Sequence, residues 1–381
     1  MLLQLFQDGI LVLSRMIKKH FLLALIFIGH PSNAETIKVK LAPYQKSVLL
    51  SANKLMEVNL EKEGVTKTGK KISFNCDFKN QENYRKSLVA SIKADGPVSF
   101  QGQEFYGDIE ILASSGKGCE VINNVKLENY LSSLLSKEMN QSWPLEALKA
   151  QAVAARSYAL SKKMNRLSHR GFHIESSERE QVSGGESDQT MRTDLAAYMT
   201  KGLVLSNKKS ELVQAYYHAH CGGKLFNPNN IWEGEFHGFV EKKCSYCKEF
   251  NGKKFKHKVS LFDLKRSLRK QKIYIKKIFE IRPNGVGFEL SGVAYDNKKK
   301  VWKLSRGKFR KVIGTKYLPS FNFDISMQGR TLSVTGKGNG HGVGMCQVGA
   351  LKMAQTGKNY KEILKYYYPN FKISQIRELK K

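Results

Sequence analysis

Residues 138–158 read EMNQSWPLEALKAQAVAARSY, and this stretch decides how the centre of the chain folds. Glu138 stands just before a Trp143-Pro144 break. Proline is tolerated in the first helical turn, where its missing N–H costs nothing, so a helix is expected from about Pro144 to Met164. Its many alanines predict a helix that neighbouring elements approach closely or bury on nearly all sides. Alanine's high helix propensity explains the alanines alone, but not the polar residues Gln151 and Arg156 among them.

Around this helix the hydrophobic pattern changes period. From Thr36 to about Lys126, short alternating apolar runs separated by Gly and Asn predict strands. A helix is expected from Leu127 to Met139, a surface loop over residues 165–195, and strands at 203–205 and 213–217. Further helices are expected at 261–271 and 346–356, the second after a glycine-rich loop at 336–344.

The sequence therefore predicts an α+β fold. It would have a β-rich N-terminal region, a central alanine-rich helix packed on mixed or antiparallel strands, and a C-terminal glycine-rich loop and helix that close a cleft. The expected segments are a signal peptide (1–34), a β-rich part (35–126), a helix and Cys-Gly-Gly region (127–249), a basic insertion or subdomain (250–330) and a C-terminal part (331–381).

The N-terminus predicts export. Lys18, Lys19 and His20 precede an apolar run from Phe21 to Ile28, and small residues end at Ala34, as in a cleaved secretory signal whose true start would be Met16. The run is much shorter than the ~20 residues of a spanning helix, so no stable membrane span is expected. We therefore expect a periplasmic or wall-associated protein.

The net charge of the full chain is +31, and removal of residues 1–34, whose net charge is +2, leaves +29. A strongly positive protein favours polyanionic partners. Because an exported protein rarely meets nucleic acid, and no basic-aromatic motif is present, the envelope is the expected partner and nucleic acid is not.

Six cysteines follow the signal segment, and export permits disulfides. Cys244 and Cys247 form a C-x-x-C pair that also suits zinc. Cys221, Cys244, Cys247 and Cys346 could form a structural metal site if their segments meet, and a pair of disulfides is an equal alternative. A partly free, buried set of cysteines is a third. Cys76 and Cys119 could pair within the β-rich region.

Two glycine-rich corners could carry chemistry. Residues 336–345 read GKGNGHGVGM, with His341 at the tip, and residues 216–223 read YYHAHCGG, with His218 at the end of a predicted strand. The first corner lacks the Lys-Ser/Thr of a nucleotide-binding P-loop. Dense glycine allows close approach of the backbone to a ligand. His341 could serve a site or simply bond to a neighbouring carbonyl, and the two interpretations are equal.

Several motifs in one order resemble the SpoIID/LytB family of sporulation stage II protein D-like peptidoglycan lytic transglycosylases and amidase enhancers. They are Glu138-Met139, residues 146–158, Cys221-Gly222-Gly223, and residues 340–350 (GHGVGMCQVGA), together with Tyr366-Tyr367-Tyr368-Pro369 near the C-terminus. The resemblance covers roughly residues 36–370, apart from the basic segment. It implies cleavage of the MurNAc-GlcNAc bond of peptidoglycan glycan strands without hydrolysis, to give anhydro-muramic ends.

The resemblance maps the family's catalytic glutamate onto Glu138. One carboxyl group can act as acid and then as base because the sugar's own C6 hydroxyl is the nucleophile, unlike the two-carboxylate hydrolases. No cofactor is required for this chemistry. Glu146 lies in the first turn of its helix, where an acid is favoured by the dipole, and is assigned a structural role. The residues expected to bind substrate are Gln151, Arg156, Tyr158, His218, His341 and Gln347.

Gln151 and Arg156 lie five positions apart and do not share one face, so one is expected to brace the Glu138 loop and the other to face inward or line the cleft. Some family members carry a His/Cys zinc site in the loop after the long helix. Here residues 172–185 contain no cysteine, so the resemblance does not carry that site over. The alternative function is a non-catalytic peptidoglycan-binding activator of a wall amidase or other hydrolase. Glycan strands, with or without stem peptides, and a wall amidase are the expected partners.

Overall fold

The N-terminal part of the protein is a large sheet in a computed structural model that describes residues 35–61, 63–77, 87–114, 117–165, 171–177, 181, 190–247, 254–285 and 287–380. The predicted signal segment, 1–34, lies outside these residues. The sheet order is β6-β5-β2-β4-β7-β8-β1-β9, and β3 pairs with β2. Its strands are β1 (Thr36–Lys40), β2 (Ser47–Leu60), β3 (Val65–Asn75), β4 (Ser87–Ala94), β5 (Val98–Phe100), β6 (Gln103–Phe105), β7 (Asp108–Ser114), β8 (Gly118–Lys126) and β9 (Ile174–Glu175).

Alternating apolar residues build this sheet's core. Val48 and Leu50 of β2 are buried while Leu49 between them is exposed, and Ile109 and Ile111 of β7 are both buried. Successive side chains of a strand point to opposite faces, so this pattern buries one face of the sheet. A disulfide between the buried Cys76 and Cys119 joins the end of β3 to β8.

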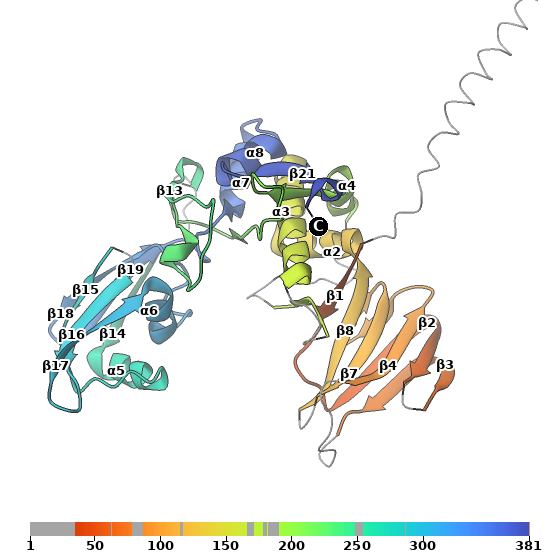
Figure 1. Ribbon diagram of the computed structural model, residues 1–381, viewed down its shortest axis with the longest axis horizontal. Coiled ribbons are helices and arrows are strands. Elements are labelled where there is room, and N and C mark those ends of the chain that lie inside the picture. Colours follow the sequence, from red (N-terminus) through yellow and green to blue (C-terminus); the bar gives the residue numbers. More distant parts are fainter. Residues whose placement is uncertain are drawn as a thin grey trace, which may run out of the picture. The chain divides into compact units, whose positions relative to one another are not determined.

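The central helix α3 (Leu145–Asn165) is buried on all sides from Ala147 to Ser161. It contacts α2 (Leu127–Glu138), α4 (Met191–Met199), α7 (Gln347–Gln355), α8 (Tyr360–Tyr367) and strand β10 (Leu203–Ser206). The four helices surround α3 in Figure 1. Alanine side chains allow these neighbours to approach closely. The α+β class and the all-round burial predicted for this helix are therefore confirmed.

Short strand pairs join distant parts of the chain. β10 pairs antiparallel with β21 (Lys372–Gln375), β11 (Tyr217–His218) pairs parallel with β20 (Met345–Cys346), and β12 (Lys224–Leu225) pairs antiparallel with β13 (Lys242–Lys243). Within the described ranges, 3-10 turns occupy Pro228–Asn230, Ser245–Cys247 and Ile376–Glu378. The strand predicted at 213–217 is shorter than expected, because only Tyr217 and His218 pair.

Residues 254–337 form two three-stranded sheets and two helices around a core of their own. The predicted boundary at 330 falls in the turn between β18 and β19, so this segment extends to Lys337. Its elements are β14 (Lys254–Ser260), α5 (Leu261–Lys270), β15 (Lys277–Pro283), β16 (Gly287–Val293), β17 (Lys299–Ser305), α6 (Arg306–Ile313), β18 (Phe323–Gln328) and β19 (Thr331–Lys337).

The helices predicted at 144–164, 261–271 and 346–356 match α3, α5 and α7 within one or two residues. The loop predicted at 165–195 is wrong at two places, because Ile174–Glu175 form β9 and α4 starts at Met191. The remainder of that loop lies largely outside the described residues. None of the helices within the described ranges is long and apolar enough to cross a membrane.

We predict that replacing both sheet cysteines, in Cys76→Ser/Cys119→Ser, lowers the free energy of unfolding by about 2–4 kcal/mol, because the crosslink restricts the unfolded chain. Urea unfolding of the purified chain would measure the change. The pair Cys76→Ala/Cys119→Ala is the control for burying two hydroxyls. An unchanged unfolding midpoint in both variants would contradict the prediction.

Candidate functional site

The two glycine-rich corners meet through the parallel pair of β11 and β20. Tyr217 lies opposite Met345, and His218 lies opposite Cys346. Gly344 makes this approach possible: its φ is +68°, and a Cβ there would lie 1.9 Å from the carbonyl oxygen of Tyr216. A side chain at position 344 would therefore separate the corners.

Glu138 and Gln347 come together across 209 residues of sequence. Glu138 ends α2 and is half-buried, and Gln347 begins α7 directly after β20. The Gln347 Nε2 amide donates a hydrogen bond to Glu138 Oε2 at 3.3 Å. Since only 5% of Gln347 is exposed, the structure places it against the Glu138 carboxylate rather than in open contact with a polymer.

A buried polar network lies beside Glu138. Gln181 donates from Nε2 to the Tyr217 hydroxyl at 3.0 Å and accepts at Oε1 from the Tyr130 hydroxyl at 2.8 Å. Burial and then the nearby charge of Glu138 raise the pKa of Tyr217 well above its usual range. Tyr217 therefore stays protonated at neutral pH and keeps an O–H proton to donate near Glu138. Sequence reasoning assigned no role to Tyr217 or Gln181.

The loop that follows Glu138 is braced by Arg192 of α4. Its Nε donates to the Gln141 carbonyl at 3.2 Å, and one terminal nitrogen donates to the Trp143 carbonyl at 2.8 Å. This bracing was expected from Gln151 or Arg156. No signal in the sequence pointed to Arg192, because it follows a polar stretch that predicts only loop.

Arg156 corrects one prediction. It is fully buried, and it forms a two-bond ion pair with Glu128 at 3.1 and 2.6 Å. Its remaining donors reach the carbonyls of Leu203 and Ala197. The guanidinium therefore joins α3 to α2, α4 and β10 and does not contact a substrate.

Gln151 is five residues from Arg156 and therefore lies about 140° away from it around α3. Tyr158 is two turns after Gln151 and lies on the same side of the helix as Gln151. Gln151 is fully buried, which contradicts its predicted contact with substrate, and its amide has no hydrogen-bond partner among the described residues. Tyr158 is 7% exposed, and its ring meets the ring of Tyr216 edge-on at 6.0 Å.

The structural role predicted for Glu146 fits its contacts. One carboxylate oxygen accepts from Lys149 Nζ at 2.7 Å, and the other accepts from the backbone N–H of Tyr360 at 2.8 Å. Tyr360 is the first residue of α8, so Glu146 joins the starts of two helices and satisfies an amide that the helix leaves unbonded.

His341 is half-buried among aromatic rings. Its ring centroid lies 5.1 Å from that of Trp232, 5.4 Å from that of His218 and 6.1 Å from that of Tyr216. The Val343 N–H donates to its Nδ1 at 3.1 Å, and burial holds its pKa well below the usual range. A neutral His341 therefore carries its proton on Nε2.

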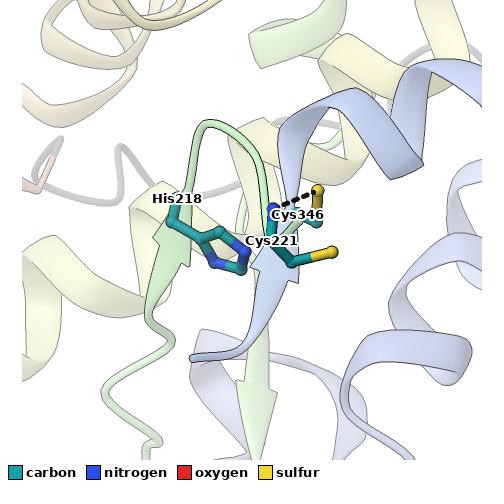
Figure 2. A group of neighbouring side chains, drawn as sticks. All are labelled: His218, Cys221 and Cys346. Atoms are coloured by element: carbon teal, nitrogen blue, oxygen red, sulfur yellow. Dashed lines mark hydrogen bonds between the residues drawn. The ribbon is translucent and has the colours of Figure 1, made fainter. Parts of the chain in front are cut away.

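The predicted cysteine cluster assembles. Cys221, Cys244, Cys247 and Cys346 are all buried, and none is in a disulfide. His218 is also buried there: its Nδ1–H donates to the Val343 carbonyl at 3.0 Å, and its ring faces Cys221 and Cys346 (Figure 2). The substrate-binding role predicted for His218 stays a prediction, and the structure adds its position beside these cysteines.

A cavity of about 680 Å³ lies next to this region. It is bounded by the end of α3 and by segments 207–216, 235–239 and 370–371, and Tyr216, Phe236 and Phe239 are among its lining residues. Glu138 does not line it. The cavity therefore adjoins the aromatic cluster rather than the carboxylate.

Comparison with known proteins identifies the class. Residues 115–206, from the start of β8 to the end of β10, match the SpoIID family model, described as stage II sporulation protein. An uncharacterized protein of Brachyspira hyodysenteriae is 29% identical over 300 residues, which cover 78% of this chain and 79% of that protein. The matched residues include α2, α3 and α4, so the similarity to the SpoIID family covers the helical centre of the chain.

Two named relatives narrow this further. The amidase enhancer of Bacillus subtilis is 28% identical over 286 residues, 63% of this chain and 39% of that protein. The stage II sporulation protein D of Bacillus amyloliquefaciens is 26% identical over 268 residues, 67% of this chain and 76% of that protein. These matches support assignment of the chain to the SpoIID/LytB family, which its motifs resemble.

We predict that Arg156→Leu lowers the free energy of unfolding by roughly 3–5 kcal/mol, because it leaves Glu128 without its partner and several carbonyls without a donor. The control is Arg266→Leu, which removes an exposed ion pair with Asp263 and should cost less than about 1 kcal/mol. Chemical unfolding measures both. A stable Arg156→Leu variant that binds glycan poorly would instead support a substrate role.

Proposed function

We propose that this protein is an exported peptidoglycan lytic transglycosylase in which Glu138 is the acid and then the base. The observation that carries the proposal is the hydrogen bond from Gln347 to Glu138. It joins the carboxylate to the Gly-His-Gly motif, the two features that the family resemblance links to the site. Similarity to the SpoIID family model, to an amidase enhancer and to a stage II sporulation protein D supports a role on the cell wall.

The proposed reaction balances without water or a cofactor. Protonated Glu138 gives its proton to the glycosidic oxygen between MurNAc and GlcNAc, and the bond from that oxygen to MurNAc C1 breaks. The C6 hydroxyl of the same MurNAc attacks C1, and the Glu138 carboxylate takes the hydroxyl proton. The products are a 1,6-anhydro-MurNAc end and a free GlcNAc hydroxyl, and Glu138 is protonated again.

The neighbours of Glu138 suit this cycle. Gln347 donates to the carboxylate at 3.3 Å and so favours one orientation of the side chain. Tyr217 keeps its proton and is near enough to feel the charge of Glu138. Arg192 fixes the loop that leaves α2. We infer that these three residues are positioning residues, and that the glycine-rich loop and α7 close the cleft over the glycan.

The net charge and a group of aromatic side chains support glycan strands as the substrate. A net charge of +31 on the full chain favours an acidic wall polymer. Trp232 and Tyr216 next to His341 offer ring faces on which sugars can stack. We propose glycan strands as the partner, denuded or with stem peptides. The Cys76–Cys119 disulfide supports export, because disulfides persist in oxidising compartments.

A second candidate is an activator of a wall amidase. It is favoured by the similarity to the amidase enhancer of Bacillus subtilis. In this case the protein would bind peptidoglycan and stimulate a hydrolase without cleaving glycan itself. The same Glu138 variant separates the two candidates.

We predict that Glu138→Gln reduces release of anhydro-muropeptides or anhydro-glycans from purified peptidoglycan by roughly 10³-fold or more, because glutamine can neither give nor take the proton. Mass spectrometry of the products measures this. Glu146→Gln is the matched control and should retain activity, since Glu146 bonds to Lys149 and Tyr360 rather than to the site.

Retained activity of Glu138→Gln would refute the catalytic assignment. Wall binding without anhydro product in the wild type, together with stimulation of an added amidase, would establish the second candidate instead.

We predict that Gln347→Leu lowers kcat about 10- to 100-fold with little change in KM, because one hydrogen bond to a charged group is worth about 1.5–3 kcal/mol. Steady-state kinetics on soluble glycan fragments measures both constants. A raised KM with unchanged kcat would show that Gln347 binds substrate, as the sequence analysis expected.

A further inference from the structure

Four cysteine side chains converge from three separate segments. Cys221 follows β11, Cys244 and Cys247 flank the 3-10 turn at Ser245–Cys247, and Cys346 ends β20. Each is at most 3% exposed. The Sγ of Cys247 lies 3.3 Å from that of Cys221, 3.6 Å from that of Cys244 and 3.2 Å from that of Cys346. The cluster is therefore compact and closed to solvent.

The spacing suits one tetrahedral metal. Zn–S bonds of about 2.3 Å place the sulfurs of a four-cysteine site about 3.8 Å apart. The three separations fall within about 0.6 Å of that value and are far from a disulfide bond of about 2.05 Å. The sulfurs of Cys221, Cys244 and Cys247 also lie within 4.8 Å of one another.

Backbone donors surround the sulfurs as they do around metal-bound thiolates. Cys346 Sγ accepts from the N–H groups of Cys221 at 3.3 Å and Gly349 at 3.4 Å, and Cys221 Sγ accepts from Gly223 N–H at 3.4 Å. Cys346 also caps the start of α7, where the helix dipole favours negative charge. These contacts orient the sulfurs and stabilise their deprotonated form.

The close packing around the cysteine cluster depends on Gly349. A Cβ at Gly349 would lie 1.9 Å from the Tyr367 hydroxyl and 3.3 Å from Cys247 Sγ. Tyr367 in turn lies 3.6 Å from Cys244 Sγ. Tight packing of Gly349 and Tyr367 against Cys247 and Cys244 therefore forms one side of the cysteine cluster.

Disulfide pairing is the alternative for these cysteines. The same chain contains the Cys76–Cys119 disulfide, whereas none of the four clustered cysteines is in a disulfide, although the Sγ of Cys247 lies 3.2–3.6 Å from those of the other three. In a compartment that permits disulfides, four adjacent thiols are protected from oxidation when a metal holds them as thiolates. This contrast favours metal over disulfides.

We propose that Cys221, Cys244, Cys247 and Cys346 bind one structural Zn²⁺. The ion would join the Cys-Gly-Gly corner, the C-x-x-C turn and the start of α7. His218 lies beside the cluster: one of its ring nitrogens is within 4.8 Å of Cys221 and Cys346 Sγ, and the four sulfurs complete a tetrahedral set without it (Figure 2).

The site would also act on the proposed catalytic residues, and this part alone rests on the proposed function. Cys346 directly precedes Gln347, whose amide donates to Glu138. A metal that fixes Cys346 therefore fixes the first turn of α7 and the position of Gln347. Loss of the metal should release that contact.

The test begins with metal analysis of the full mature chain. Purified protein should contain about one equivalent of Zn²⁺ by mass spectrometry of the element. Refolding with Co²⁺ should give the sulfur-to-cobalt charge-transfer and visible bands of a tetrahedral thiolate site. No bound metal, or disulfides among the four cysteines in a peptide map of the native protein, would overturn the proposal.

Variants then assign the ligands. Cys244→Ser and Cys346→Ser should each lower zinc affinity at least tenfold, and the matched pair Cys76→Ser/Cys119→Ser should keep one equivalent. His218→Ala should also keep the metal, and its loss there would refute the four-sulfur set. If a cysteine variant fails to fold, thiol titration of the wild type replaces it: chelator should expose four thiols, and thiols already reactive without chelator would refute the site.

Activity separates the two proposals. A zinc-loaded wild type that releases no anhydro product would refute the transglycosylase and leave the metal site intact. A metal-free wild type that is fully active and equally stable to heat would refute the metal site and leave the transglycosylase intact.

Discussion

The parallel pairing of β11 with β20 is the contact on which the rest of this region depends. Two residues on each side, Tyr217 with Met345 and His218 with Cys346, join segments more than 120 residues apart. Gln347, directly after β20, donates to Glu138, while Cys346 of β20 and Cys221 just after β11 belong to the group of buried sulfurs. The candidate catalytic centre and the proposed metal centre therefore both depend on this one strand pair. Neither can form until the C-terminal part of the chain has folded against the rest.

The alanine-rich helix α3 provides the second constraint. Small side chains let α4, α7, α8 and β10 approach it from several sides, so its buried polar residues are removed from water. Arg156 forms hydrogen bonds to Glu128 and to backbone carbonyls. These partners explain how its guanidinium can be fully buried without exposing charge to an apolar core. The helix is therefore a structural axis, and the site is built at its border by α2 and α7.

Much of the local structure could be predicted from the sequence because the signals are local. Pro144 and the alanines indicate α3, and the glycines of 336–344 indicate the corner. Arg156 was assigned to substrate because its true neighbour, Glu128, is distant in the sequence and no local pattern names it. Arg192 was missed for the same reason: its contacts are backbone carbonyls of another segment. Gln347 was found only through the family resemblance, and its contact with Glu138 required the fold.

The segment 254–337 begins and ends as a neighbouring pair in one sheet, since Lys254 of β14 lies opposite Lys337 of β19. Chain entry and exit are therefore about one strand spacing apart, roughly 5 Å. Because the two ends are adjacent, the length, charge or fold of the segment can change without moving the glycine-rich corner that follows. A short turn could also replace the whole segment. The adjacency of its two ends therefore uncouples the size of this basic segment from the position of the glycine-rich corner beside it.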